Sequence, residues 1–292
     1  MYSMRVLLLF SVLGTLWIVL CVVYSQLFGR NNFNEENRNI IKNIEKTISQ
    51  IKDMDPKTIE YFQDQAKNRK IALNDVPMTE DYLVLYNVLV PEIYCTDLTR
   101  VGRVTDGGKW MCNPLRVKNM DKCTVYSLGI SNEPSFEVDF QNFTGHKCLV
   151  RSVDKDDQTP ETMKNIENAN GVFKKAKISS LSDIKNHSYK FTDILKYFND
   201  TVIDILKIDI EGYEFEIKDE LFSVPICQIL IEIHGGPALK TLQLLQEFSA
   251  HDYYLFSYEI NGRYHTGAEY GFLHKSCFDK FGVQTILGRY LS

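Results

Sequence analysis

Two short stretches of the sequence place charged side chains at every second position of an otherwise aliphatic run. The first, LKIDIEG, carries Lys207, Asp209 and Glu211 before a glycine, and the second, ILIEIHGG, carries Glu232 and His234 before two glycines. Alternate residues of a β-strand point to the same face, so each stretch predicts a strand whose polar face ends at a turn. A charged face is unusual on a buried strand, and it indicates a strand that ends at a wet cleft.

These polar side chains would form one site if the two strands were neighbours, because their carboxyl ends would then meet at one edge of a sheet. Three carboxylates and one imidazole can act as acid and base toward a substrate, or can bind a hard metal ion. The residues leave the presence of a metal open. The structural alternative for each side chain is a simple hydrogen-bonding role at the end of a strand.

Apolar runs that alternate with helical patterns predict the elements that would position such a site. Strands are predicted over residues 123–130, 147–154, 171–179, 202–210, 227–236, 253–261 and 270–275. Helices are predicted over residues 190–199, with Thr192 as the N-cap, and over residues 238–250. This alternation predicts an α/β domain with a mainly parallel sheet flanked by helices. Ligands of such sheets bind where the strand order reverses.

The first two predicted strands carry a second candidate site. Gly129 follows the first strand, and Asp154 ends the second. In doubly wound folds an acid at this place binds the hydroxyls of a nucleoside ribose. The chain has one glycine where the dinucleotide fingerprint has three, so turn formation is the structural alternative for Asp154.

The N-terminal part of the chain has the composition of a membrane anchor. No charged residue occurs from Val6 to Gly29, and this apolar stretch is long enough to cross a hydrocarbon core of about 30 Å. We therefore predict a cytoplasmic tail over residues 1–5, a transmembrane signal anchor over 6–28, a stem over 29–80 and a folded domain over 81–292. The stem would contain an amphipathic helix with isoleucines at 40–51 and a linker over 63–75. The alternative is a cleaved signal peptide and a secreted protein.

Cysteine content and sequons favour the secretory pathway. One of the seven cysteines lies in the apolar stretch, and the other six predict up to three disulfides, with no pair assigned and Cys227 as a candidate plain core residue. Glycosylation sequons begin at Asn142, Asn186 and Asn199. The prediction is a type II single-pass protein, held in the lipid bilayer of the endoplasmic reticulum or Golgi with its domain in the lumen. A net charge of −5 and a pI near 5.7 argue against a nucleic-acid partner.

Several stretches, in order along the chain, resemble one enzyme family. LKIDIEGYEFEI resembles the signature of the FkbM-like methyltransferases, and VYSLGISNEPSFE is similar to the cofactor-loop strand of their animal, membrane-anchored relatives. RVGRVTDGGKWMCNP, whose DGGKW part predicts a tight turn, is similar to the segment before that strand. The similarity continues through ILIEIHGG and FSYEIN to about Glu269.

The resemblance implies a Rossmann-like class I methyltransferase fold that uses S-adenosylmethionine. It places Leu128 and Gly129 in the cofactor loop and Asp154 at the ribose of the cofactor. It places Asp209 and Glu211 beside the methyl donor.

The catalytic prediction assigns His234 or Asp209 as the base and Glu211 to orientation of the substrate. Glu232, Glu259 and Asn261, with Glu269, are candidate substrate-side residues, and a turn role is the alternative for Asn261. The predicted acceptor is a glycan hydroxyl or a protein side chain.

Two other functions are compatible with the sequence. A type II glycosyltransferase shares the layout of anchor, stem and domain, and would bind a metal and a nucleotide sugar with paired acids. A catalytically silent relative would keep the fold as a binding protein. The stretch DKDD after the second strand departs from the Asp-Pro that is more usual in the family, which favours the silent relative.

Overall fold

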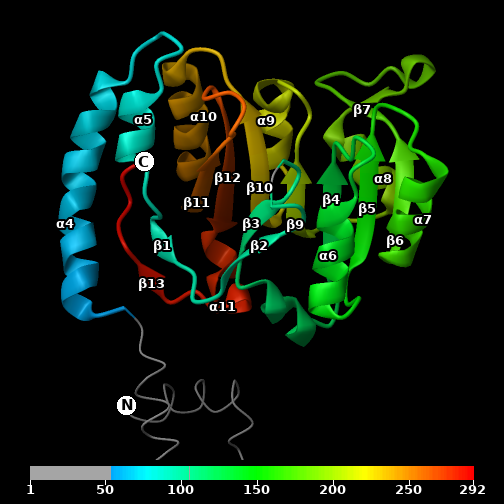
Figure 1. Cartoon of the computed structure of the whole chain (residues 1–292), viewed down its shortest axis with the longest axis horizontal. Helices are drawn as coiled ribbons and strands as arrows, with labels where there is room; N and C mark the ends of the chain where they lie inside the picture. The colour runs from blue at the N-terminus through cyan, green and yellow to red at the C-terminus, as the bar shows by residue number, and fades with distance from the viewer. Residues whose placement is uncertain (1–53, 105) are drawn as a thin grey trace, which may run out of the picture. The chain divides into compact units, whose positions relative to one another are not determined.

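The structure is a computed structural model that describes residues 54–104 and 106–292 (Figure 1). The predicted anchor over 6–28 and the predicted isoleucine helix over 40–51 lie outside the described residues. No helix of the described ranges combines the length and the apolar character that a bilayer crossing needs. Residues Met54–Ser292 form one unit, which contains all the elements discussed below.

A seven-stranded sheet with the order β11-β12-β10-β9-β4-β5-β6 forms the centre of this unit (Figure 1). Its strands are β4 (Thr124–Leu128), β5 (Leu149–Asp154), β6 (Gly171–Lys175), β9 (Ile203–Ile208), β10 (Ile226–His234), β11 (Tyr253–Ile260) and β12 (Gly267–His274). Five adjacent strands of this sheet, in the order β10-β9-β4-β5-β6, are parallel. Strand β12 runs antiparallel to both of its neighbours, β10 and β11. The strand order reverses between β4 and β9. The predicted Rossmann-like α/β fold with a mainly parallel sheet is confirmed.

The helices follow the strands in alternation. They are α4 (Pro56–Ala72), α5 (Leu83–Val88), α6 (Ser135–Thr144), α7 (Pro160–Asn168), α8 (Phe191–Phe198), α9 (Glu214–Phe222), α10 (Ala238–Ala250) and α11 (Phe278–Phe281). Alternate strand residues face two different core clusters: Leu206 packs in the cluster that contains α8 and α10, and Ile205 packs in the cluster that contains α6. Burial on both faces explains why β9 has a near-continuous apolar sequence.

A hairpin and a short sheet complete the unit. The hairpin pairs β2 (Leu98–Val101) with β3 (Lys109–Cys112) in antiparallel register. The short sheet pairs β1 (Ile93–Tyr94) with β13 (Thr285–Ile286). A small parallel pair, β7 (Lys177–Ile178) and β8 (Ser188–Tyr189), follows β6. The turn predicted for the DGGKW stretch is the connection of the hairpin, and this connection brings β3 to the site.

Two local predictions differ from the structure. The stretch expected as a linker over 63–75 is helical: it continues α4 to Ala72 and ends in a 3-10 turn over Leu73–Asp75. Helix α4 begins with Pro56 after the N-cap Asp55 and buries Ala66 in the core. The stretch has few apolar residues and no wide apolar face, so its pattern did not indicate a helix. Tertiary packing stabilises the helix instead. Thr192 is not the N-cap of α8: that position belongs to Lys190, and the Thr192 hydroxyl donates to Glu220 instead.

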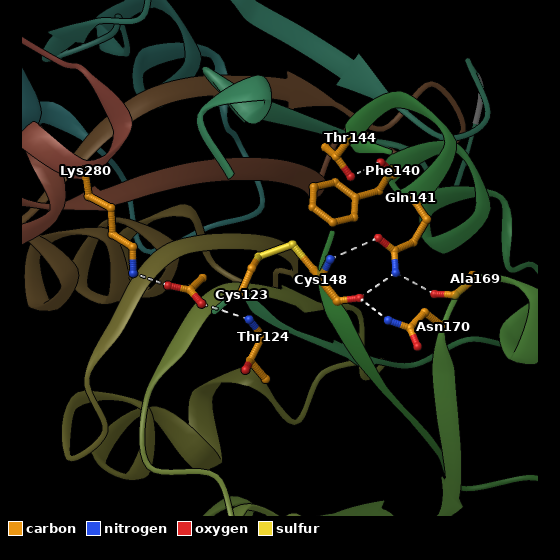
Figure 2. The surroundings of a disulfide bond; sticks show 10 residues. Cys123, Thr124, Phe140, Gln141, Thr144, Cys148, Ala169, Asn170 and Lys280 are labelled. Carbon is orange, nitrogen blue, oxygen red and sulfur yellow. Dashed lines mark hydrogen bonds and ion pairs between the residues drawn. A yellow bond between two sulfur atoms is a disulfide. The ribbon is translucent and has the colours of Figure 1, made fainter. Parts of the chain in front are cut away.

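Three disulfides join the six cysteines, in the pairs Cys95–Cys112, Cys123–Cys148 and Cys227–Cys277. Cys227 is therefore not a plain core thiol. Figure 2 shows Cys123 and Cys148 directly before β4 and β5, where the Gln141 amide donates to the carbonyl of Cys148 at 2.6 Å. The Cys123–Cys148 disulfide joins the amino ends of β4 and β5. It therefore lies at the opposite end of these strands from their carboxyl ends.

The three sequons lie in different settings. Asn142 is exposed within α6, but its partner Thr144 is buried and bonded to the Phe140 carbonyl. Asn186 and Asn199 are exposed, the first in a 3-10 turn and the second at the C-cap of α8. Glycosylation at these positions stays a prediction.

Candidate active site

A cavity of about 360 Å³ opens at the carboxyl ends of β4, β5, β9 and β10, where the strand order reverses. Its volume lies within the range of small-molecule sites. The lining includes these predicted site residues: Gly129, Asp154, Asp209, Glu211, Glu232 and His234. The position agrees with the expectation that the charged strand ends share one edge of the sheet.

Gly129 brings the ends of β4 and β9 into direct contact. Its φ is +82°, and a Cβ at this position would lie 1.7 Å from the carbonyl oxygen of Asp209. The backbone N–H of Asp209 donates to the Leu128 carbonyl at 2.9 Å, and the Lys207 ammonium donates to the Gly129 carbonyl at 2.8 Å. The Leu128 side chain is fully buried in the core and does not line the cavity, so only its backbone serves the loop.

The Asp154 carboxylate holds the backbone of the loop that follows β4. One carboxylate oxygen accepts from the backbone N–H groups of Ile130 at 2.8 Å and Ser131 at 2.7 Å, and the other accepts from Asp156 at 2.8 Å. The turn role considered for Asp154 is therefore present. A carboxylate has about four lone-pair positions, so three bonds leave one acceptor position for a hydroxyl in the cavity.

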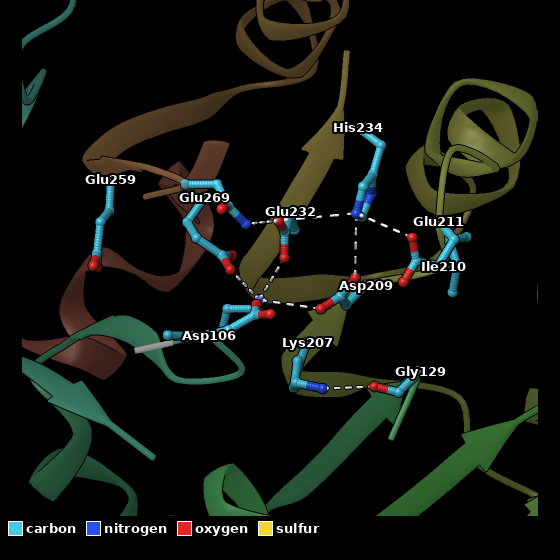
Figure 3. Close-up of polar contacts among 12 residues, drawn as sticks. Asp106, Gly129, Lys207, Asp209, Ile210, Glu211, Glu232, His234, Glu259 and Glu269 are labelled. Atoms are coloured by element: carbon cyan, nitrogen blue, oxygen red, sulfur yellow. Dashed lines mark hydrogen bonds and ion pairs between the residues drawn. The ribbon is translucent and has the colours of Figure 1, made fainter. Parts of the chain in front are cut away.

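A buried lysine that the sequence analysis did not single out lies at the centre of the acidic cluster. The Lys109 ammonium, on a side chain that is 1% exposed, is 3.6 Å from a carboxylate oxygen of Asp209 and 3.6 Å from one of Glu232. It also donates a close hydrogen bond to Glu269, which Figure 3 shows beside Glu232 and Asp209. Lys109 is the first residue of β3, and its only sequence signal is that it falls within the stretch resembling the methyltransferases.

The register of the sheet explains why a lysine is needed there. Glu232 of β10 is paired with Glu269 of β12, which is paired in turn with Glu259 of β11. Like charges directly opposite each other on neighbouring strands are destabilising. The β2–β3 hairpin supplies positive groups opposite these side chains. Lys109 contacts Glu232 and Glu269, and the Arg100 Nε atom lies 2.8 Å from the Glu259 carboxylate.

The charges in this cluster shift the pKa values of its members. Burial raises the pKa of Glu269 to about 8, against the opposing effect of Lys109, so this carboxyl holds a proton near neutral pH. Burial alone would also raise the pKa of Asp209, but the positive charges of Lys109, Lys207 and His234 outweigh it and lower the pKa. Asp209 is therefore ionised and a weak base.

His234 is surrounded by carboxylates. Its Nε2 atom is 3.4 Å from Glu211, 3.8 Å from Asp209 and 3.8 Å from Glu232, and its Nδ1 atom is 3.4 Å from the buried Glu214. Burial lowers the pKa of His234, but the bond and charge of Glu214 and the other carboxylates raise it to about 9. The ring is an imidazolium at pH 7, which does not favour the predicted role of His234 as a base near neutral pH.

We expect the His234 ring in the free protein to titrate near pH 9, as an NMR titration would show when compared with His234→Gln. Because the folded pKa lies above the unfolded value of about 6.5, protonation stabilises the fold below about pH 6.5, and this contribution is lost as the pH rises through 9. Solvent at the cavity reduces the expected loss to about 1–2 kcal/mol relative to His234→Gln in urea unfolding. A ring that titrates near 6.5 would contradict the ion pairs described here.

The predicted substrate-side residues separate into two groups. Glu232 lines the cavity and accepts from the Asn261 amide at 2.9 Å, while the Asn261 oxygen accepts from the Arg263 backbone in a turn. Glu259 lies apart from the cluster (Figure 3), with its carboxylate bonded to Arg100 and to the Trp110 indole at 2.6 Å. Glu259 does not line the cavity, and its role on the substrate side stays a prediction.

Asp209, Glu232 and His234 each offer a ligand atom, and these atoms lie within 4.8 Å of one another. Such a set is small enough to hold a metal ion. The Lys109 ammonium and the His234 imidazolium supply part of the positive charge that offsets these carboxylates. We assign no metal here.

One family model and several solved structures match the chain. A family model described as a methyltransferase domain matches residues 52–274. The precorrin-6y C5,15-methyltransferase of Geobacter metallireducens is 14% identical, over 56% of this chain and 85% of that chain, with a TM-score of 0.35. A human methyltransferase 10 domain containing protein is 12% identical, over 76% of this chain and 99% of that chain, with a TM-score of 0.35.

A third solved structure, the fibrillarin of Aeropyrum pernix in complex with natively bound S-adenosylmethionine, is 12% identical over 63% of this chain and 86% of that chain, with a TM-score of 0.36. None of the curated proteins compared with the chain matches it. The structural likenesses concern the fold alone, whereas the family match covers most of the chain. The chain belongs to the methyltransferase domain family.

Proposed function

We propose that the chain transfers a methyl group from S-adenosylmethionine to an acceptor bound in the cavity at the carboxyl ends of β4, β5, β9 and β10. The observation that carries this proposal is the position of the cavity, which joins the Gly129 loop and Asp154 to the polar ends of β9 and β10. The family match supports the reaction class.

The residues of the cavity divide into two parts with different tasks. The loop at Gly129 and Ser131 with Asp154 would hold the methyl donor, whose sulfonium supplies an activated methyl group. The ends of β9 and β10 would hold the acceptor. Alignment of the acceptor with the methyl group is the main task of the protein, since a correctly oriented pair of reactants reacts far faster than a free pair.

The finer parts of the proposal rest on the sequence. We place the protein among the FkbM-like, membrane-anchored relatives, in the lumen of the endoplasmic reticulum or Golgi, with a glycan hydroxyl or a protein side chain as acceptor. The uncharged stretch from Val6 to Gly29 supports the anchor, and the three disulfides are typical of an oxidising compartment. A glycosyltransferase is disfavoured by the family match. The silent relative is an outcome of the test below.

Calorimetric titration of the purified full chain with S-adenosylmethionine, and then with S-adenosylhomocysteine, tests the proposal. We expect saturable binding of both, and a loss of affinity of about tenfold or more in Asp154→Ala, because the loop loses the acceptor for three backbone N–H groups. The matched control is Asp157→Ala, whose exposed carboxylate pairs with Lys175 outside the cavity. A folded, disulfide-intact protein that binds neither compound would be the silent relative.

A further inference from the structure

The part of the cavity formed by β9 and β10 presents carboxylates to a bound acceptor. Asp209, Glu211 and Glu232 all line it. The Glu211 side chain is 69% exposed, whereas the side chain of Lys109 is 1% exposed. The ammonium therefore lies beneath the carboxylates and cannot reach a ligand in the cavity. An acceptor meets the acidic side of the cluster first.

Negative charge is in excess at this position. Four carboxylates lie within 3.8 Å of the ring nitrogens of His234, including that of the buried Glu214. The imidazolium of His234 and the ammonium groups of Lys109 and Lys207 offset three of these four charges, so one negative charge is left over. A cation of the size of an ammonium ion would offset the remainder, since opposite charges at about 4 Å attract strongly in a partly buried site.

The cluster is poorly suited to an alcohol as acceptor. An alcohol must lose its proton as the new bond forms, so it needs a nearby base with a pKa close to the working pH. His234 is protonated at neutral pH, and the pKa of Asp209 is lowered. A neutral amine carries a free lone pair and needs no base at that step.

We propose that the acceptor is a primary amine that is an ammonium ion in water, such as a lysine side chain, held by Glu211 and Asp209 at the ends of β9 and β10. This inference rests on the proposed methyl transfer and names its substrate class. Tyr264 lines the same part of the cavity and offers an aromatic ring to the cation.

The reaction balances without a further reactant. The ammonium first releases one proton to water, to which the Glu211 end of the cavity is open. The nitrogen lone pair then forms a bond to the methyl carbon, and the carbon–sulfur bond breaks with its electron pair moving to sulfur. The products are S-adenosylhomocysteine and a methylammonium ion, whose positive charge is again stabilised by Asp209 and Glu211.

Transfer of radiolabelled methyl groups from S-adenosylmethionine by the full chain tests this inference. The probes are a peptide library with one lysine at its centre, the same library with serine, a mixture of secretory glycans, and 1,4-diaminobutane. We expect labelling of amines at least about tenfold above the serine library and the glycans, which corresponds to about 1.4 kcal/mol. Labelling of lysine peptides alone indicates a protein acceptor, and labelling of diaminobutane alone indicates a small amine.

Two variants separate a role at the acceptor from a general effect. Glu211→Gln should lower kcat/KM for the amine by about tenfold or more, with the donor affinity within about twofold of wild type. Glu216→Gln, at an exposed position of α9 outside the cavity, should change neither. Donor binding without a preference for amines, or with transfer to serine or glycans, overturns the amine acceptor alone. Absence of donor binding overturns the proposed function and this inference together.

Discussion

Replacing Lys109 with methionine is expected to lower the free energy of unfolding by about 3–5 kcal/mol at neutral pH. The side chain is 1% exposed, and its ammonium contacts Asp209, Glu232 and Glu269. Burial lowers the pKa of Lys109, but these carboxylates outweigh it and raise the pKa, so the group is charged in the folded protein. Removal of one partner of a buried ion pair leaves uncompensated charge in the interior, which is the costly case. Urea unfolding followed by circular dichroism measures the change.

The expected loss depends on pH and on the partners of Lys109. Without the ammonium, the folded-state pKa of Asp209 rises, so the variant loses more stability at pH 8 than at pH 5. Glu269→Gln alone should cost little, because this carboxyl already holds a proton near neutral pH. Lys164→Met, at an exposed position of α7, is the matched control. A Lys109→Met protein as stable as this control would contradict a role of Lys109 in neutralising the cluster.

The sequence predicted the sheet and the edge of the sheet that carries the site. Strand and helix patterns are properties of neighbouring residues, so β9 and β10 were found within two residues of their ends, and α10 was found at its bounds. The strand alternation predicted for LKIDIEG stops earlier than expected, because β9 ends at Ile208 and Glu211 lies in a turn with φ of +57°. The prediction of a shared edge was still useful. It placed Asp209, Glu211, Glu232 and His234 at one edge, and the structure brings these four together.

The partners of these residues could not be predicted from the sequence, because they depend on strand register and tertiary packing. Lys109 reaches the site because the β2–β3 hairpin packs over the sheet, and the same hairpin supplies Arg100 as the partner of Glu259. Glu214 is the first residue of α9 and is not part of an alternating pattern. It nevertheless lies 3.4 Å from the His234 Nδ1 atom and raises the pKa of His234. The sequence alone did not indicate this raised pKa.

Gly129→Ala is expected to abolish measurable binding of S-adenosylmethionine, a loss of about a hundredfold or more, and to lower the free energy of unfolding by at least about 2 kcal/mol. The added Cβ would lie 1.7 Å from the Asp209 carbonyl oxygen, which belongs to the backbone and cannot rotate away. The ends of β4 and β9 must then separate, which moves the donor loop and the acceptor residues at once. Calorimetric titration and urea unfolding of the same preparation measure both effects.

Gly212→Ala separates this clash from backbone strain. Gly212 has a φ of +97°, similar to the +82° of Gly129, but a Cβ there would have no atom within 4 Å. Both variants carry the cost of a left-handed alanine, and only Gly129→Ala forces the two strands apart. We therefore expect Gly212→Ala to lose about 1 kcal/mol of stability and to keep its affinity for the donor. Equal losses of affinity in the two variants would show that strain in the loops, rather than the contact between β4 and β9, controls the shape of the cavity.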